Sequence, residues 1–143
     1  MNVLLVEDNE GDIELTERAF ERGNLTATLS VTHNGAEAIE YLSRQGRFSD
    51  AVKPDLILLD LNMPRMGGHQ FLEIVKQDEK LKSIPVIVLT SSSAPKDIRG
   101  CYERHANCYI LKPFDPLKFM DMIKQVEDFW ANLVQLPDKT ASI

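Results

Sequence analysis

Polar and charged side chains follow four short apolar runs of this 143-residue chain. Glu7 and Asp8 come after the first run, Asp60 after the second, Thr90 after the third and Lys112 after the last. Carboxylates at close range repel one another unless a cation joins them. If these runs bring the three acids together, they predict a site for a hard metal ion, with Mg²⁺ first and Mn²⁺ or Ca²⁺ as substitutes. An acidic site that also holds a hydroxyl and a lysine is typical of phosphoryl chemistry.

Asp60 is the candidate for the reacting group, because carboxylates can form aspartyl-phosphate intermediates. The loop that follows it, Leu61–Gly68, has backbone carbonyls free to bind an ion, and its two final glycines permit a tight turn into a helix. Lys112 would act as a point charge on the phosphoryl oxygens and Thr90 as a hydrogen-bond donor to one of them. The alternative is that Thr90 satisfies only backbone groups and that Lys112 is a solvated charge.

The elements that must position these residues alternate between strands and helices. The four apolar runs are continuous, which is typical of parallel strands covered by helices on both faces, whereas residues 27–32 alternate as an edge strand does. Helical patterns occupy Ile13–Phe20, Ala36–Leu42, Phe71–Val75, Pro95–Glu103 and Pro116 to about Leu136. This order predicts an α/β fold, a doubly wound parallel sheet of five strands in the order 2-1-3-4-5. Ligands bind such sheets at the carboxyl ends of the strands where the order reverses, which is where the acids would meet.

The composition is that of one acidic globular domain. Lys and Arg number 16 against 22 Asp and Glu, a net charge of −6, which argues against binding to nucleic acids or anionic membranes. The N-terminal apolar run is too short for a signal peptide or a membrane span. Cys101 and Cys108 fit neither a zinc ribbon nor a disulfide framework, so a cytoplasmic protein with reduced thiols is expected.

The residues that follow the predicted strands together resemble the signature of the receiver domain of two-component response regulators. The resemblance covers about residues 1–125 and is carried by Glu7–Asp8, Asp60 with Met63–Pro64 and Gly68 downstream, Thr90, and Lys112–Pro113. It implies a receiver fold of the flavodoxin-like type. It also implies that a sensor histidine kinase transfers a phosphoryl group from its phosphohistidine to Asp60, so the protein would be a phosphoacceptor and not a turnover enzyme.

The resemblance implies further roles at the site. Glu7, Asp8 and Asp60 would be metal acids, and the backbone carbonyl of Asn62 would be a metal ligand. The Lys112–Pro113 peptide bond is expected to be cis.

Thr90 and Tyr109 would form the switch pair of such a receiver domain. Phosphorylation of Asp60 should pull Thr90 inward and leave space for Tyr109 to turn toward the core, which would change the face made by the fourth helix, fifth strand and fifth helix. Two residues depart from the family pattern. His105 stands where a helix-ending glycine is common, and Ser91 stands where alanine or glycine often follows the switch hydroxyl, so it could alter dephosphorylation.

The flanking segments show a narrower resemblance. Arg47–Pro54, His105–Tyr109 and Phe129–Pro137 are similar to the stand-alone regulators partnered with bacterial and cyanobacterial phytochromes. This likeness implies a phytochrome as the partner kinase.

The C-terminal segment is longer than one edge of the sheet needs. We expect a receiver domain over residues 1–125 and a helical extension over 126–143, frayed from Asp138, with no separate output domain, so that output passes through an unidentified downstream protein. An overhanging helix would expose Phe129, Trp130, Leu133 and Val134, and we predict that these form an arm of a homodimer made through the fourth helix, fifth strand and fifth helix. The alternative is that the tail folds back onto its own domain.

Two other function classes stay open at this point. A phosphatase of the haloacid dehalogenase type also uses an Asp at a strand end, but it needs a second Asp two residues on, where this chain has Asn62. The other class is a phosphorylation-independent interaction module of the same fold, which has no need for the full set of acids, hydroxyl and lysine.

Overall fold

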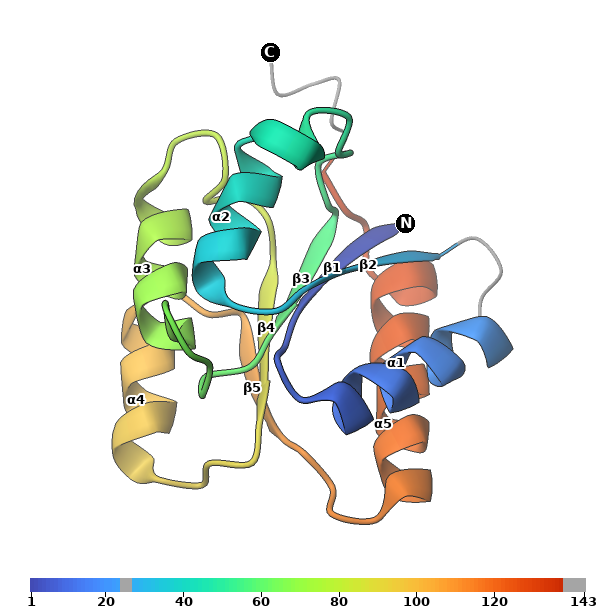
Figure 1. Ribbon diagram of the computed structural model, residues 1–143. Helices are drawn as coiled ribbons and strands as arrows, with labels where there is room; N and C mark the ends of the chain where they lie inside the picture. The colour runs from blue at the N-terminus through green and yellow to red at the C-terminus, as the bar shows by residue number, and fades with distance from the viewer. Residues whose placement is uncertain (24–26, 138–143) are drawn as a thin grey trace.

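The computed structural model describes residues 1–23 and 27–137, and in these ranges strands and helices alternate along the chain (Figure 1). The strands are β1 (Asn2–Val6), β2 (Thr28–Thr32), β3 (Leu56–Leu59), β4 (Val86–Thr90) and β5 (Cys108–Leu111). The α-helices are α1 (Glu10–Arg22), α2 (Gly35–Leu42), α3 (Gly68–Gln77), α4 (Pro95–Glu103) and α5 (Pro116–Asp128). A 3₁₀ turn, η1 (Gly46–Phe48), follows α2, and a π-helical turn, η2 (Phe129–Leu133), follows α5.

The strands form one parallel sheet in the order β2-β1-β3-β4-β5, which confirms the predicted fold. Helices α2, α3 and α4 cover one face of the sheet, and α1 and α5 cover the other (Figure 1). The strand order reverses between β1 and β3, whose carboxyl ends point toward the lower edge of the molecule in Figure 1.

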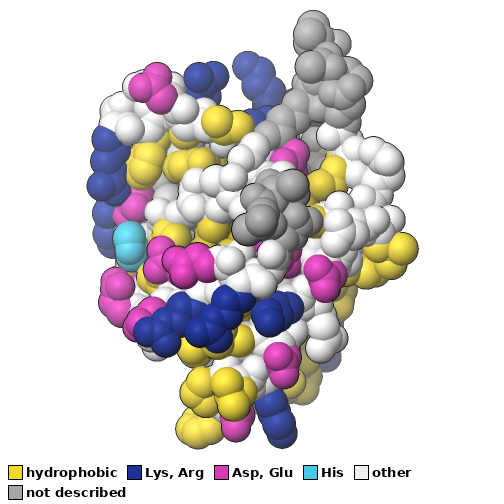
Figure 2. Space-filling model, turned by 90° about the vertical axis from the view of Figure 1, so that its right-hand side faces the viewer, with side chains coloured by type: hydrophobic (Ala, Val, Ile, Leu, Met, Phe, Trp, Pro, Cys, Tyr) yellow, Lys and Arg dark blue, Asp and Glu magenta, His cyan; other side chains and the backbone are white. Residues whose placement is uncertain are grey.

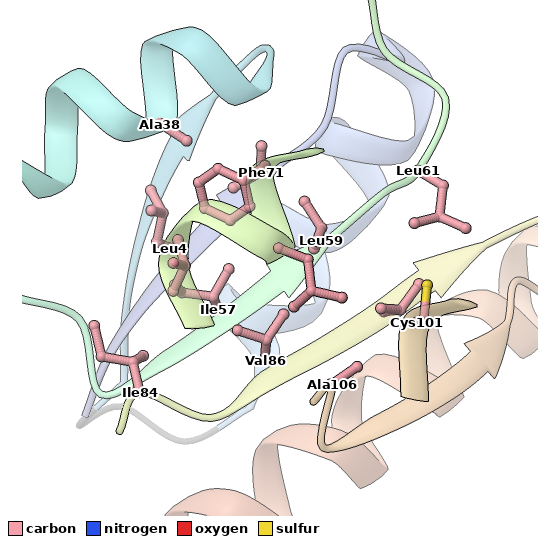
Figure 3. Close-up of a cluster of buried hydrophobic side chains, with 14 residues drawn as sticks. Leu4, Ala38, Ile57, Leu59, Leu61, Phe71, Ile84, Val86, Cys101 and Ala106 are labelled. Carbon is pink, nitrogen blue, oxygen red and sulfur yellow. The ribbon is translucent and has the colours of Figure 1, made fainter. Parts of the chain in front are cut away.

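Two hydrophobic clusters, one on each face of the sheet, explain why β1, β3 and β4 are continuously apolar. In β1, Leu4 points into the cluster under α2, α3 and α4, whereas Leu5 points into the cluster under α1 and α5. Figure 3 shows the first cluster, in which Phe71 of α3 packs against the sheet beside Leu4 and Ile57. Successive apolar residues of β1, β3 and β4 are therefore buried alternately on the two faces, and burial of one such side chain contributes about 1.5–3 kcal/mol.

The helices next to the strand ends begin at side-chain caps. Asn9 caps α1 by accepting a hydrogen bond from the backbone N–H of Asp12, and Asp115 caps α5 in the same way ahead of Pro116. The cap at Asn9 turns the chain from the end of β1 into α1 within three residues, so the first turn of this helix lies beside the carboxyl end of the sheet.

The last helix is shorter than predicted. The predicted extended C-terminal helix is confirmed, but it ends earlier than expected: the α-helix runs to Asp128 and the π-helical turn to Leu133, and Val134 has an extended backbone, so the predicted end at about Leu136 is wrong. Among the residues described, no helix is long and apolar enough to cross a membrane. The frayed end predicted at Asp138–Ile143 lies outside the described residues.

The π-helical turn changes which tail residues are exposed. Phe129 and Leu133 are exposed, at 47% and 75%, as predicted. Trp130 and Val134 are only half-exposed, and Trp130 packs against the cluster under α1 and α5. A π turn has more residues per turn than an α-helix, which rotates the following side chains out of the seven-residue pattern on which the prediction relied.

Candidate functional site

Three carboxylates meet where the strand order reverses. Glu7 and Asp8 follow β1 and Asp60 follows β3, and one oxygen of each can be chosen so that all three lie within 4.8 Å of one another. Glu7 and Asp60 are buried, while Asp8 is exposed. The donor set consists of hard oxygen ligands from different chain segments, which fits a divalent cation such as Mg²⁺.

Lys112 lies opposite these acids, just after β5. Its Nζ is 2.5 Å from Glu7 Oε1, 2.8 Å from Asp12 Oδ2 and 3.7 Å from Asp60 Oδ1. The prediction of a cis Lys112–Pro113 bond is wrong, since the bond is trans. The trans form is the lower-energy form of an X–Pro bond by about 0.5–1 kcal/mol, and the Lys112 N–H still donates to the Thr90 carbonyl at 2.9 Å.

Burial and charge pairing oppose each other at this site. Burial raises the pKa of Glu7 from its ordinary 4.5 to about 7, although the hydrogen bond from Lys112 pulls it down. Burial would lower the pKa of Lys112, but its hydrogen bonds to Asp12 and Glu7 outweigh burial and raise that pKa. Lys112 is therefore a permanent cation, while Glu7 is the group that exchanges a proton near neutral pH.

A cleft of about 370 Å³ opens over the acids. Its lining residues are Asp8, Asn9, Asp12, Asp60, Asn62, Ser91, Lys112, Pro113 and Phe114. Asn62 is exposed and lines the same cleft as Asp8 and Asp60, and the role of its backbone carbonyl as a metal ligand stays a prediction. Ser91, the residue noted for its departure from the family pattern, also faces the cleft.

The predicted switch residues lie beside the cleft and do not line it. Thr90 is the last residue of β4 and is fully buried, and its Oγ1 accepts a 3.5 Å bond from the Ser92 N–H. Tyr109 of β5 donates its hydroxyl to the Ser92 carbonyl at 2.8 Å. Burial raises the pKa of Tyr109, although the Ser92 bond opposes it, so this hydroxyl is a donor at neutral pH. Both switch residues are thus tied to one loop residue.

A polar chain continues from Ser92 and was not predicted. Ser92 Oγ donates to Asp97 Oδ2 at 2.6 Å, and Asp97 Oδ1 lies 2.9 Å from His69 Nε2. The bonds from Ser92 and His69 lower the pKa of Asp97. His69 belongs to α3 and Asp97 to α4, so these hydrogen bonds connect two helices to the loop to which Tyr109 is bonded. No pattern in the sequence connects His69 with a residue 28 positions further along on another helix, which is why this contact was not predicted.

The strand-end argument also missed Asp12, because this residue lies in a helix. A signal was present: the Asn9 cap predicts a helix directly after β1, and Asp12 belongs to the acidic first turn of that helix.

Exposed hydrophobic side chains gather at the end of α5 that lies beside the cleft. Figure 2 shows them gathered at the lower end of the face that α1 and α5 form. Phe114 and Leu117, just before and within the first turn of α5, are exposed at this end of the sheet, and Phe114 also lines the cleft.

Comparisons with known proteins agree with this geometry. Residues 3–124 match the response regulator receiver domain. Response regulator Rcp1 of Synechocystis is 37% identical over 135 residues, which cover 94% of this chain and 92% of Rcp1.

Two solved structures share the fold over almost the whole chain. The phosphorylated cyanobacterial phytochrome response regulator RcpA superposes with a TM-score of 0.92 at 39% identity, covering 96% of this chain and 98% of RcpA. The Mn²⁺-bound form of Rcp1 gives a TM-score of 0.91 at 36% identity, covering 96% of this chain and 99% of Rcp1. The family prediction is confirmed: the chain belongs to the response regulator receiver domain family, whose members are signalling proteins.

Proposed function

We propose that this chain accepts a phosphoryl group on Asp60 from the phosphohistidine of a sensor histidine kinase and signals to partner proteins by a change of conformation. The observation that carries the proposal is the placement of the Asp60 carboxylate beside two further acids and 3.7 Å from Lys112, at the floor of a cleft. A carboxylate that is buried and flanked by a lysine can act as a nucleophile on phosphorus without a second catalytic acid.

The transfer is a single displacement at phosphorus. An Asp60 oxygen attacks the phosphorus atom, the P–N bond of the donor phosphohistidine breaks, and the imidazole nitrogen keeps the electron pair and takes up a proton. Lys112 offsets negative charge on the phosphoryl oxygens. Glu7, Asp8, Asp60 and the Asn62 carbonyl would hold Mg²⁺, which supplies further charge compensation, and Mn²⁺ or Ca²⁺ could substitute. The Mn²⁺-bound state of Rcp1 supports a divalent metal at this site.

The switch would begin at Thr90, whose hydroxyl becomes a donor to the phosphoryl group. Thr90 Oγ1 now faces the Ser92 N–H, and Tyr109 is bonded to the Ser92 carbonyl. Movement of Thr90 therefore acts on the same loop that positions Tyr109 and, through Asp97, the first turn of α4. Tyr109 and the first turn of α4 both belong to the face made by α4, β5 and α5.

We propose that the partner kinase is a phytochrome. We also propose that this protein acts in the cytoplasm and that it contacts neither nucleic acid nor membrane. The proposal of a phytochrome partner is supported by the similarity, over nearly the full length, to RcpA, which is a cyanobacterial phytochrome response regulator. Exposed Phe114 and Leu117 beside the cleft give a protein donor an apolar surface to contact. We assign residues 1–125 to the receiver domain and 126–143 to an extension. We propose that the protein is a phosphoacceptor that loses its phosphoryl group by self-catalysed hydrolysis, and not a turnover enzyme.

Labelling with a small phosphodonor tests the assignment of Asp60. With phosphoramidate and Mg²⁺, the intact mass of the wild-type protein should increase by one phosphoryl group, and Asp60→Asn should abolish the increase because the nucleophile is lost. Asp50→Asn, which changes an exposed carboxylate in the loop before β3, is the matched control and should label normally. Undiminished labelling of Asp60→Asn would refute the proposal.

Phosphate release in the same assay separates the other classes. A stoichiometric label that decays slowly is expected for a receiver domain. Continuous release of phosphate over many equivalents would indicate a phosphatase, and no label on the wild-type protein would indicate a phosphorylation-independent module.

A further inference from the structure

Asp12 is a fourth acid in the cleft, and it faces the lysine instead of the metal acids. Its Oδ2 lies 2.8 Å from Lys112 Nζ, and its side chain is 26% exposed. It is not one of the three acids whose oxygens lie within 4.8 Å of one another. Its charge is therefore directed to Lys112 and stays there when a cation occupies the other three carboxylates.

Helix α1 holds the Asp12 backbone from both sides. The Asp12 N–H donates to the Asn9 side chain at 2.9 Å, and the Asp12 carbonyl accepts the buried Thr16 hydroxyl at 2.7 Å. The carboxylate is thus presented to the cleft from a fixed helical turn. A side chain carried on a fixed backbone can restrain its partner at a smaller entropic cost than a side chain on a flexible segment.

The three N–H donors of the Lys112 ammonium have unequal partners. Two are engaged by Glu7 and Asp12 at short distances, and Asp60 lies at 3.7 Å, beyond a hydrogen bond. Glu7 is one of the acids that would hold the metal ion. When Glu7 turns its charge to the ion, Asp12 is the carboxylate that keeps the ammonium in the cleft.

We propose that Asp12 is a positioning residue for Lys112, which it holds so that the remaining N–H faces the phosphoryl group on Asp60. The inference rests on the proposed function of Asp60. It assigns to the first turn of α1 a part in binding the phosphoryl group.

Binding of beryllofluoride, a phosphoryl analogue, measures this effect at equilibrium. With saturating Mg²⁺, Asp12→Ala should weaken beryllofluoride binding about fivefold, measured by ¹⁹F NMR, because Lys112 loses its fixed partner. Glu10→Ala removes an exposed acid from the same turn of α1 and should leave the affinity within about twofold. Asp12→Asn, which keeps the shape of the side chain, replaces Asp12→Ala if the latter fails to fold.

A double-mutant cycle separates positioning from charge repulsion. In a Lys112→Met background, Asp12→Ala should no longer weaken binding, because the residue it positions is absent. An equal change in both backgrounds, or tighter binding of Asp12→Ala in the wild-type background, would overturn the inference.

The ammonium signal of Lys112 gives a readout that does not require phosphoryl chemistry. In ¹⁵N-labelled protein with Mg²⁺, the Lys112 NH₃⁺ resonance, assigned by its absence in Lys112→Met, should persist in the wild type and be lost to fast exchange in Asp12→Ala. Persistence in Asp12→Ala refutes the positioning role even if Asp60 accepts a phosphoryl group. Conversely, loss of the signal supports it even if the wild-type protein fails to bind beryllofluoride, which would count against the proposed function alone.

Discussion

At the scale of single residues, the site contains more acidic than basic side chains, and one cation, Lys112, contacts three of the acids. Lys112 is almost buried and faces Glu7, Asp12 and Asp60, so removing it would leave buried carboxylates uncompensated. Burial raises the pKa of Glu7 to about 7 in spite of the lysine. Because Glu7 is one of the acids that would hold a metal ion, we expect metal binding at this site to depend on pH.

Metal binding should weaken as the pH falls through 7. A bound cation requires the carboxylate form of Glu7, whereas the free protein binds a proton there with a pKa of about 7. The dissociation constant for Mg²⁺ should therefore increase about tenfold from pH 8 to pH 6, with release of a proton on binding at pH 6.5. Isothermal titration calorimetry in two buffers of different ionisation enthalpy measures both quantities.

Glu7→Gln is the control for this pH dependence and should flatten the profile between pH 6 and pH 8. The metal-free protein should show the linked effect on stability. Because the folded pKa of Glu7 is raised above 4.5, the stability that it contributes is fully present below pH 4.5 and is lost as the pH rises through about 7. A Mg²⁺ affinity that is constant from pH 6 to pH 8 in the wild-type protein contradicts the raised pKa.

At the scale of elements, the strands and the residues after them could be predicted, because both follow from local sequence. Continuous apolar runs such as Leu56–Leu59 have no polar face, which only a sheet covered on both sides accommodates. Parallel strands then deliver the residues that follow them to one edge, which brought Glu7, Asp8, Asp60 and Lys112 together without further information.

Features that depend on contacts between helices could not be predicted in this way. The bond between His69 and Asp97 joins α3 to α4, and Asp12 reaches Lys112 from α1 across the cleft. His105, which stands where a glycine is common, follows α4 with a φ of 69°, in the left-handed region that a glycine would adopt at lower cost. The end of α5 was missed because a π turn leaves the apolar repeat unchanged while rotating the side chains.

Helix α3 holds the loop after Asp60 through a close backbone contact at Gly68. A Cβ at this position would lie 2.5 Å from the Asp60 carbonyl oxygen and 2.8 Å from Leu61 Cα, so the backbone of the reacting residue would have to move. We expect Gly68→Ala to lower the free energy of unfolding by about 1–3 kcal/mol and to slow labelling of Asp60. Urea denaturation and the phosphoramidate assay measure the two effects.

Gly67→Ala is the matched control, because its Cβ would meet only the Leu61 carbonyl oxygen at an ordinary 3.4 Å. Gly67→Ala should lower the free energy of unfolding by less than Gly68→Ala does, and it should leave the rate of Asp60 labelling unchanged. Equal stability and equal labelling rates for the two variants would show that the close approach at Gly68 does not position Asp60.

At the scale of the whole molecule, the site and the tail occupy opposite ends of α5. The helix starts beside the cleft at Pro116 and runs to Asp128, where the π-helical turn continues it. Its inner side is part of the core, since Ile123 and Val126 are buried and Trp130 packs against the same cluster. The tail is therefore partly folded back onto its own domain, and only Phe129 and Leu133 remain as exposed large apolar side chains of this turn.

We propose a homodimer through the face of α4, β5 and α5, with an arm formed by Phe129, Trp130, Leu133 and Val134. Truncation before Val126 is not a clean test, because Val126 and Glu127 at the start of the extension are buried against the receiver domain and would be lost. Substitution of the two exposed side chains is cleaner. Phe129→Ser with Leu133→Ser should convert a dimer into a monomer in light scattering, with little change in the melting temperature of the monomeric domain.

Phe114→Ser supplies the comparison at the other end of α5, because Phe114 is also fully exposed but lies beside the cleft. If the arm holds the dimer, Phe114→Ser keeps the dimeric mass while the Phe129 and Leu133 variant loses it. A dimer that survives in the double variant excludes the arm and leaves only α4, β5 and the rest of α5 as the interface. Since Trp130 packs inward and contacts the Phe129 ring at a centroid distance of 5.6 Å, Phe129 is positioned by the domain core, and the arm would reach its partner as a rigid extension of α5.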